Sequence, residues 1–265
     1  MQINSNVIIV NYHLKLRYHR LVHYMNMTTE DTTAFSLQTR EMFTSIAPKY
    51  DFLNKLLSVG QDRYWRKKAI QLLDPNKNDR ILDVATGTGD IILEIAKRNL
   101  TTKIFGIDFC QRMLNIGRVK VFQSGFKQSV SFQVGSGESL PFLDESFDGL
   151  VCAFGIRNFA NVKIGLKEFY RVLKPGGRIV VLEFSIPQNK LLNAIYQWYF
   201  NLILPKIGNL ISGHSNAYSY LPESVANFPN QKTFIKWIEI AGFKNVSFLE
   251  LTFGIVSIHR GYKVS

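Results

Sequence analysis

The 265-residue sequence has few cysteines and no apolar run long enough to cross a membrane. Its two cysteines, Cys110 and Cys152, are too few for a disulfide framework or a four-cysteine zinc site, and we expect both to be buried thiols. The most apolar segment, 191–210, is interrupted by polar residues, a proline and a lysine, and falls short of the ~20 apolar residues that a spanning helix needs. These absences indicate a cytoplasmic protein.

Acidic residues are also scarce, with 20 Asp and Glu against 32 Lys and Arg, which gives a formal net charge of +12. Residues 1–35 are a basic extension with no acid before Glu30, and we predict that they are disordered. The remaining charge is spread without a basic stripe interleaved with aromatics. We therefore expect attraction to anionic surfaces, including peripheral contact at the inner face of the cytoplasmic membrane, and no nucleic-acid binding.

Residues 36–265 are predicted to form a single α/β domain, because short apolar runs alternate with helical periodicity. Residues 36–75 indicate helices with a break near Pro48, and 186–230 indicate inserted helices and a loop on the substrate side. Five strands are expected to be parallel, and the last two to pair as an antiparallel hairpin. The seven predicted strands are 80–84, 103–107, 130–134, 147–154, 178–184, 246–252 and 255–262.

A glycine turn follows the first predicted strand, in the segment Leu82–Asp90. Gly87 and Gly89 allow a tight turn and a close approach of the backbone to a ligand. Ile92 stands where a dinucleotide fingerprint would have a third glycine, and no lysine follows to make a phosphate-binding loop. The pattern favours a nucleotide-type cofactor at the carboxyl ends of the strands, with a plain strand-to-helix turn as the alternative.

Two further segments extend this predicted cofactor site. Asp108 ends the second strand, where an acid can accept both ribose hydroxyls, although a helix N-cap is an alternative role. Ser136 and Gly137 follow the third strand, where an adenine would lie.

Together these motifs, followed by Leu140-Pro141-Phe142 and Leu173–Gly177, resemble those of class I S-adenosylmethionine methyltransferases. Four more segments are similar to the ubiquinone/menaquinone C-methyltransferase family, and the last two are most similar to the demethylmenaquinone methyltransferases. They are Met42–Asp51, Phe154–Asn158, Tyr218–Val225 and Leu251–Ile255.

The resemblance implies a Rossmann-like class I methyltransferase fold with helices on both faces of a seven-stranded sheet. It also implies S-adenosylmethionine as cofactor and a prenylated quinol as substrate. The predicted reaction methylates a ring carbon of demethylmenaquinol to give menaquinol. The alternatives are the 2-polyprenyl-6-methoxy-1,4-benzoquinol precursor of ubiquinone or another small phenol or lipid. Monomer and homodimer both stay open.

The predicted cofactor-binding residues are Tyr50, Asp83, Gly87, Thr88, Gly89, Asp108, Ser136 and Gly137. Of these, Thr88, Asp108, Ser136 and Gly137 are carried over by position from the family that the chain resembles. Relatives usually have Asn or Asp at the position of Ser136, so the shorter serine side chain puts that contact in doubt. Tyr50 is expected to close over the cofactor, with ordinary packing as the alternative.

The predicted catalytic residues are Arg157 and Asn158, directly after the fourth strand. The Arg157 guanidinium is always charged and can stabilise a phenolate, and Asn158 can hold the second quinol oxygen. The alternatives are an Arg157–Asp148 ion pair and helix capping. Three residues of the inserted segment are predicted to line the quinol entrance, and no metal is expected. They are His214, Tyr218 and Tyr220.

Overall fold

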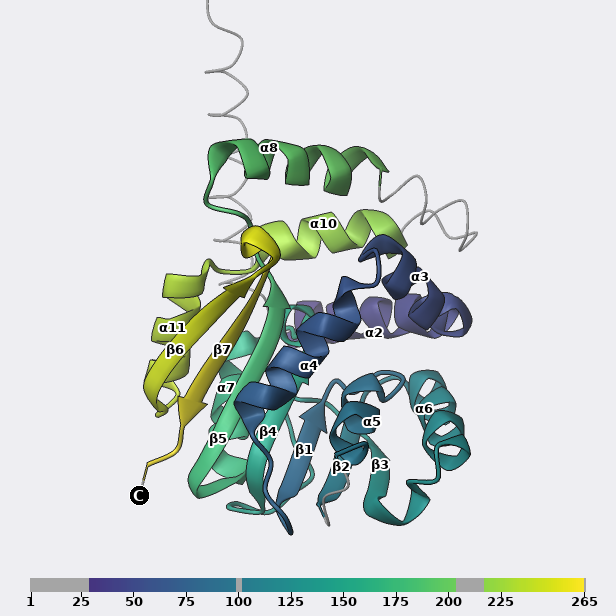
Figure 1. Ribbon diagram of the computed structural model, residues 1–265, viewed down its shortest axis with the longest axis vertical. Helices are drawn as coiled ribbons and strands as arrows, with labels where there is room; N and C mark the ends of the chain where they lie inside the picture. Colours follow the sequence, from purple (N-terminus) through teal and green to yellow (C-terminus); the bar gives the residue numbers. More distant parts are fainter. Residues whose placement is uncertain (1–28, 99–101, 204–216, 265) are drawn as a thin grey trace, which may run out of the picture.

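The computed structural model describes residues 29–98, 102–203 and 217–264, and a seven-stranded sheet lies at its centre. The strand order is β3-β2-β1-β4-β5-β7-β6, with β1 to β5 parallel and β7 antiparallel to both of its neighbours (Figure 1). This confirms the predicted sheet and its terminal hairpin. The strands are β1 Arg80–Val84, β2 Lys103–Asp108, β3 Val130–Val134, β4 Phe147–Ala153, β5 Leu173–Phe184, β6 Lys244–Leu251 and β7 Val256–Tyr262.

Helices cover both faces of the sheet, as predicted. One face carries α4 (Gln61–Leu73), α5 (Asp90–Ala96) and α6 (Gln111–Gln123), and the other carries α7 (Val162–Val172) and α11 (Gln231–Ile240) (Figure 1). Neighbouring strand residues such as Ile81 and Leu82 are fully buried and belong to separate apolar clusters, one beneath each helical layer. This burial of successive residues on opposite faces is typical of a parallel strand between two helical layers.

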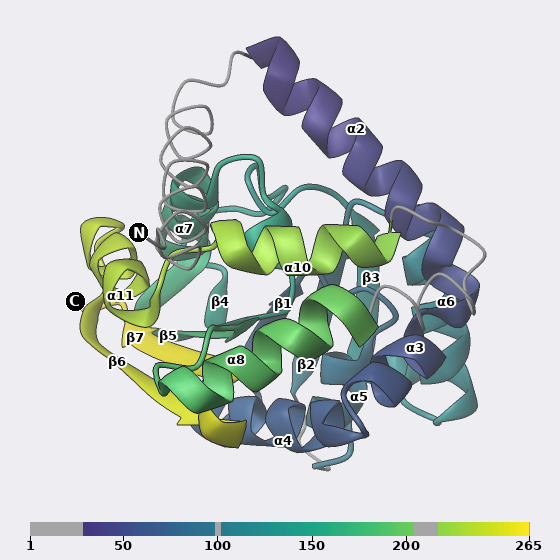
Figure 2. The ribbon, with the colours of Figure 1, turned by 90° about the horizontal axis from the view of Figure 1, so that it is seen from above.

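A third group of helices lies over the carboxyl ends of the parallel strands (Figure 2). Tyr196 and Phe200 belong to the apolar cluster that packs these helices together. None of the helices described is long and apolar enough to cross a membrane. The group comprises α2 Thr29–Ile46, η1 Ala47–Lys49, α3 Tyr50–Leu57, α8 Lys190–Trp198, the π-helical turn η4 Tyr199–Ile203 and α10 Ala217–Asn227.

The largest differences from the predicted element boundaries are at the starts of α2 and β5. Helix α2 begins at Thr29, seven residues before the expected start of the domain at 36, while residues 1–28 lie outside the described structure. Strand β5 begins at Leu173, although 174–177 was expected to be a turn. Here β5 advances five residues (173 to 178) while β4 advances two (147 to 149), so the Pro-Gly-Gly segment forms a bulge within the strand.

Candidate functional site

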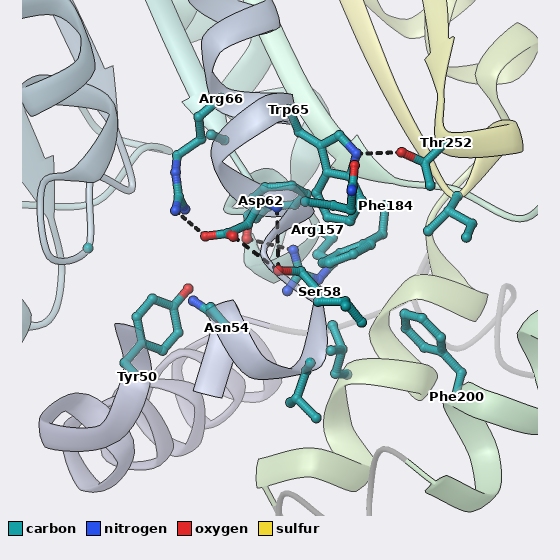
Figure 3. Close-up of a pocket in the computed structure, with 18 of the residues that line it drawn as sticks. Tyr50, Asn54, Ser58, Asp62, Trp65, Arg66, Arg157, Phe184, Phe200 and Thr252 are labelled. Carbon is teal, nitrogen blue, oxygen red and sulfur yellow. Dashed lines mark hydrogen bonds and ion pairs between the residues drawn. The ribbon is translucent and has the colours of Figure 1, made fainter. Parts of the chain in front are cut away.

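A cavity of about 530 Å³ lies between the sheet and the helices above it, in the size range of small-molecule sites. The glycine turn after β1 and helix α4 form its polar end, and aromatic side chains line the rest (Figure 3). A smaller cavity beside it shares Tyr50 and Gly87 and is also lined by Asp108, Phe109 and Met113. The larger cavity thus has a polar end and an aromatic part, the smaller one has a mixed lining, and both border the glycine turn.

The backbone at the ends of β1 and β4 adopts conformations that side chains disfavour. Gly87 and Gly89 have positive φ angles of 55° and 80°. The nearby non-glycine residues Ala85 (55°) and Phe154 (57°) also have positive φ. A Cβ on Gly155 would lie 2.4 Å from the Cβ of Ala85, so the two strand ends approach closely. Left-handed backbone at non-glycine residues tends to gather at functional sites.

Two buried carboxyl groups end β1 and β2. Asp108 accepts hydrogen bonds from the backbone N–H groups of Gly87 and Cys110, both at 2.8 Å. Burial raises the pKa of Asp108 to about 6, although these hydrogen bonds oppose the shift. Burial likewise raises the pKa of Asp83 to about 8, with a further contribution from the neighbouring Asp108 charge and an opposing hydrogen bond from the Thr86 hydroxyl. A cationic ligand would relieve this cost by favouring both ionised forms.

The predicted N-cap alternative for Asp108 is only partly realised, because Cys110 occupies the N-cap position of α6. The Asp108 carboxylate satisfies the N–H of Cys110 and also reaches across to the glycine turn at Gly87. The Asp108 carboxylate therefore joins the glycine turn to the start of α6.

Thr88 takes part in a polar network that joins the glycine turn to the helices above it. Its hydroxyl donates to Asp51 of α3 at 2.6 Å and lies 3.2 Å from the ammonium of Lys120. Lys120 also pairs with Asp51 at 2.9 Å and with Asp90 at 2.5 Å. The network holds α3, and with it Tyr50, over the turn.

Helix α4 contributes a second set of polar residues that the sequence reasoning missed. Arg66 pairs with Asp62 one turn earlier (Figure 3). It also pairs with Asp90 of α5 at 3.1 Å. Trp65 donates its indole N–H to Thr252 at 2.7 Å. The spacing of Asp62 and Arg66 on one helix face was visible in the sequence, but it is equally typical of a solvated surface pair.

Arg157 lies in the wall of the larger cavity and forms an ion pair with Glu183, at 2.7 Å between Nη1 and Oε1. The side chains are 7% and 0% exposed. Burial is the largest single effect and lowers the pKa of Arg157, but the interactions with Glu183, Tyr50 and Tyr220 together outweigh it, so that this pKa is raised. Asp148, the alternative partner of Arg157 in the sequence, pairs with Lys174 instead.

Nη1 of Arg157 also donates to the carbonyl oxygen of Phe154 at 2.6 Å, and Nε donates to the Ser224 hydroxyl at 3.3 Å. These bonds tie the guanidinium to β4, β5 and α10 at once. Glu183 itself is an acid directly after the apolar run Ile179–Leu182 of β5, which makes it unusual in the sequence but does not link it to Arg157.

Tyr220 and Asn158 meet between the two cavities. The Tyr220 hydroxyl donates to Asn158 Oδ1 at 3.0 Å; Tyr220 lines the larger cavity and Asn158 the smaller. Burial raises the pKa of Tyr220, while the Arg157 charge lowers it. Tyr218 belongs to α10, but its side chain lies outside the described structure, as does the whole of His214.

Ser136 and Gly137 follow β3, beside the end of β2, where the Gly135 N–H donates to the Asp108 carbonyl oxygen at 3.1 Å. Ser136 is exposed and its hydroxyl accepts the N–H of Glu138, and neither residue lines the two cavities described. A Cβ on Gly137 would lie 2.2 Å from the ring of Phe159, so packing against that ring requires the glycine. By contrast, Phe109 and Met113 do line the smaller cavity beside Asp108, and nothing in the sequence distinguished them from core residues.

Tyr50 lies beside the glycine turn. Its ring lines both cavities, and a Cβ on Gly87 would lie 4.0 Å from it. Burial raises the pKa of its hydroxyl, opposed by a hydrogen bond to Asn54.

Comparison with known proteins places this site in a family context. The model of the ubiE/COQ5 methyltransferase family matches residues 29–263. The ubiquinone/menaquinone biosynthesis C-methyltransferase UbiE of Geotalea daltonii is 50% identical over 225 residues, which cover 84% of this chain and 95% of the relative. The demethylmenaquinone methyltransferase of Deinococcus radiodurans is 46% identical, with 84% and 92% covered.

Solved structures show the same fold at low sequence identity. A SAM-dependent methyltransferase from Aquifex aeolicus superposes with a TM-score of 0.59 at 19% identity, covering 81% of this chain and 98% of its own. The [4+2]-cyclase SpnF gives 0.64 at 16%, covering 86% and 97%, so the fold alone does not fix the reaction. The family match does: this chain belongs to the ubiE/COQ5 methyltransferase family and is an S-adenosylmethionine-dependent methyltransferase.

Proposed function

We propose that the protein methylates a ring carbon of demethylmenaquinol to give menaquinol. The observation that carries the proposal is the larger cavity, where the Arg157–Glu183 pair lies in the wall of a space that is polar at the glycine turn and aromatic elsewhere. A quinol ring with a prenyl tail needs this combination of one charged contact and a long apolar lining. The names of the relatives point the same way.

The residues around the glycine turn fit S-adenosylmethionine. Asp83 and Asp108 are buried acids with raised pKa values, which a cationic ligand would stabilise in their charged forms. In this proposal Asp108 accepts the ribose hydroxyls, and Phe109 and Met113, which line the smaller cavity with it, offer apolar surfaces for the adenine. When bound, the cofactor supplies a methyl group activated by a sulfonium. Thr88 acts in this proposal mainly by holding α3 and Tyr50 in place.

Arg157 is proposed to stabilise the phenolate form of the quinol. A cation near the phenol oxygen lowers the pKa of that hydroxyl and shifts negative charge onto the neighbouring ring carbon. Glu183 fixes the guanidinium, and Tyr220 and Asn158 form the adjoining wall. Methyl transfer would form a C–C bond at this carbon as the S–CH3 bond breaks, and the carbon would then lose its hydrogen as a proton. One proton is released to water overall.

The ubiquinone precursor is a second candidate, because several relatives carry both quinones in their names. Both substrates present a free ring carbon beside a phenol, so the chemistry at Arg157 would be the same. We also propose that the enzyme works at the cytoplasmic surface of the membrane, because prenylated quinols reside in the bilayer.

Methyl transfer from labelled S-adenosylmethionine tests the proposal directly. The purified protein is incubated in detergent with demethylmenaquinol or with the methoxybenzoquinol, and label is measured in the extracted lipid. We expect label in demethylmenaquinol. Menaquinol, which has no free carbon at that position, is the matched control and should stay unlabelled. Label in neither acceptor would refute the proposal, and label only in the methoxybenzoquinol would assign the ubiquinone reaction.

A further inference from the structure

The mouth of the larger cavity is bordered by apolar side chains that are exposed to water. Four residues line the cavity and are also more than half exposed, which places them at its opening. We call them the apolar rim: Val59 (82% exposed), Ile195 (56%), Trp198 (57%) and Phe253 (78%). They come from the turn between α3 and α4, from α8 and from the turn between β6 and β7. Large apolar groups converging from three distant segments are unusual on a surface that faces only water.

Helix α8 extends this apolar surface beyond the cavity. Leu191 and Leu202 are 70% and 52% exposed and follow the helical spacing of Ile195 and Trp198 into η4. Tyr196, on the opposite side of α8, is 5% exposed and packs in the core of the overlying helices. The helix is thus apolar on both faces, although only one of them is covered by the described part of the chain.

Two rim residues are held in strained backbone. Val59 has φ of 53° and Phe253 has φ of 58°, in the left-handed region that glycine or asparagine adopts more easily. A β-branched valine in this region is a clear outlier. Gly60, directly after Val59, is in the same region with φ of 74°, where a glycine carries no such cost. Strain of this kind persists where the side chain has a use.

The charges around the rim match an anionic surface. No acidic residue occurs between 184 and 222 or between 52 and 61, whereas the third rim segment has the exposed Glu250 three residues before Phe253. Lys55 and Lys190 in these stretches are exposed. A second copy of this chain, with its own net charge of +12, would be repelled rather than attracted. Anionic lipid headgroups attract such a surface, and its Trp and aliphatic side chains suit the boundary between headgroups and acyl chains.

We propose that the apolar rim and the exposed face of α8 insert into the boundary of an anionic bilayer, so that the larger cavity opens onto lipid. The prenylated quinol would then enter without crossing water, and this part of the inference rests on the proposed function. Binding to lipid does not require the substrate, so the two claims can fail separately.

Vesicle binding tests the inference without quinol or cofactor. The full chain is sedimented with vesicles of equal parts phosphatidylcholine and phosphatidylglycerol, and with vesicles of phosphatidylcholine alone. We expect binding to the anionic vesicles that weakens as salt is added. The variant Leu191→Ser with Leu202→Ser changes two exposed residues that do not line the cavity. It should lower the partition coefficient at least about tenfold.

Two further variants separate lipid insertion from loss of folding. Val59→Asn puts a residue that tolerates left-handed backbone in the rim, so it should keep the melting temperature while weakening vesicle binding. Leu143→Ser changes another strongly exposed residue (84%) just before β4, at the amino ends of the parallel strands and so at the opposite end of the sheet from the rim. This variant should bind like the wild type. The Leu191/Leu202 variant should still methylate a short-tailed quinol in detergent.

Three results would overturn the inference. The first is wild-type protein that does not sediment with anionic vesicles. The second is a Leu191/Leu202 variant that binds as tightly as the wild type. The third is a wild-type dimer in sedimentation velocity that this variant dissociates while vesicle binding is absent, because the surface would then be an interface between two copies. Loss of turnover on the short-tailed quinol in every sample would count against the proposed function alone.

Discussion

Arg157 and Glu183 form a buried ion pair in the wall of the larger cavity, with 2.7 Å between Nη1 and Oε1. A buried pair costs the desolvation of two charges and is weak support for stability. The guanidinium nevertheless borders the cavity and is fixed by bonds from β4, β5 and α10. We therefore interpret Glu183 as a positioning residue for Arg157.

Substitutions of this pair should separate catalysis from cofactor binding. Arg157→Ala removes the proposed phenolate contact and should lower kcat by about 10²–10⁴-fold, with little change in the Kd of S-adenosylmethionine. Glu183→Gln keeps the shape but not the charge, so the guanidinium is less firmly held and kcat should fall about tenfold or more. The measurements are steady-state kinetics and titration calorimetry on both variants.

Asp148→Asn is the matched control for these variants, because it removes an ion pair with Lys174 that lies away from the cavity. Its turnover should stay near that of the wild type. An Arg157→Ala enzyme with normal kcat would remove Arg157 from the mechanism, and a Glu183→Gln enzyme with normal kcat would make Glu183 purely structural.

Cofactor binding should release protons near neutral pH. Burial raises the pKa of Asp83 from its ordinary value of 3.8 to about 8, and that of Asp108 to about 6. A bound cation favours the ionised carboxylates and lowers both pKa values, so the complex holds fewer protons than the free protein. Affinity should therefore rise with pH between 6 and 8, by up to about tenfold per pH unit for each proton released.

Calorimetry in two buffers of different ionisation enthalpy measures this release. The binding heats at neutral pH should differ between buffers for the wild type, and Asp83→Asn should remove most of the difference. Identical heats for the wild type would show that Asp83 is already ionised without ligand.

The same raised pKa values also predict that the free protein loses stability as pH rises from the ordinary carboxyl range toward 8, because its folded state holds protons that the unfolded chain has released.

The Thr88 hydroxyl should matter for affinity more than for turnover. Thr88→Val keeps the shape but removes the 2.6 Å bond to Asp51, which loosens α3 and Tyr50 above the glycine turn. Loss of a hydrogen bond to a charged group should raise the cofactor Kd by about tenfold, and calorimetry measures it. Thr102→Val is the control, since its hydroxyl donates to the carbonyl oxygen of Asn76 at 3.2 Å just before β2, at the opposite end of that strand from Asp108. An unchanged Kd for Thr88→Val would show that the network does not support binding.

Local signals made much of the fold predictable. Strands β1 and β3 lie at their predicted bounds, because each is a short apolar run between turn residues. The bulge in β5 was missed because Pro-Gly-Gly is more typical of a turn between elements than of a position within a strand. The start of α2 at Thr29 was missed because residues 29–35 show no helical periodicity of apolar residues.

The site was predictable where its residues lie together in the sequence. Gly87, Gly89 and Asp108 follow two buried strands, and parallel strands bring their carboxyl ends to one edge. The partner of Arg157 was not predictable, because Glu183 reaches it from a strand 26 residues away and no local pattern links them. The aromatic lining was not predictable either, since Tyr196 and Phe200 have the same spacing whether a helix lines a cavity or packs in a core.

The position of the transferred methyl group tests the central claim most directly. The protein is incubated with S-adenosylmethionine labelled with ¹³C in its methyl group and with demethylmenaquinol, and the lipid product is examined by NMR. The Arg157 geometry predicts that the labelled methyl lies on the ring carbon beside the phenol. A labelled methoxy group would contradict it, because the oxygen held by Arg157 would then be the acceptor and not the group that activates carbon.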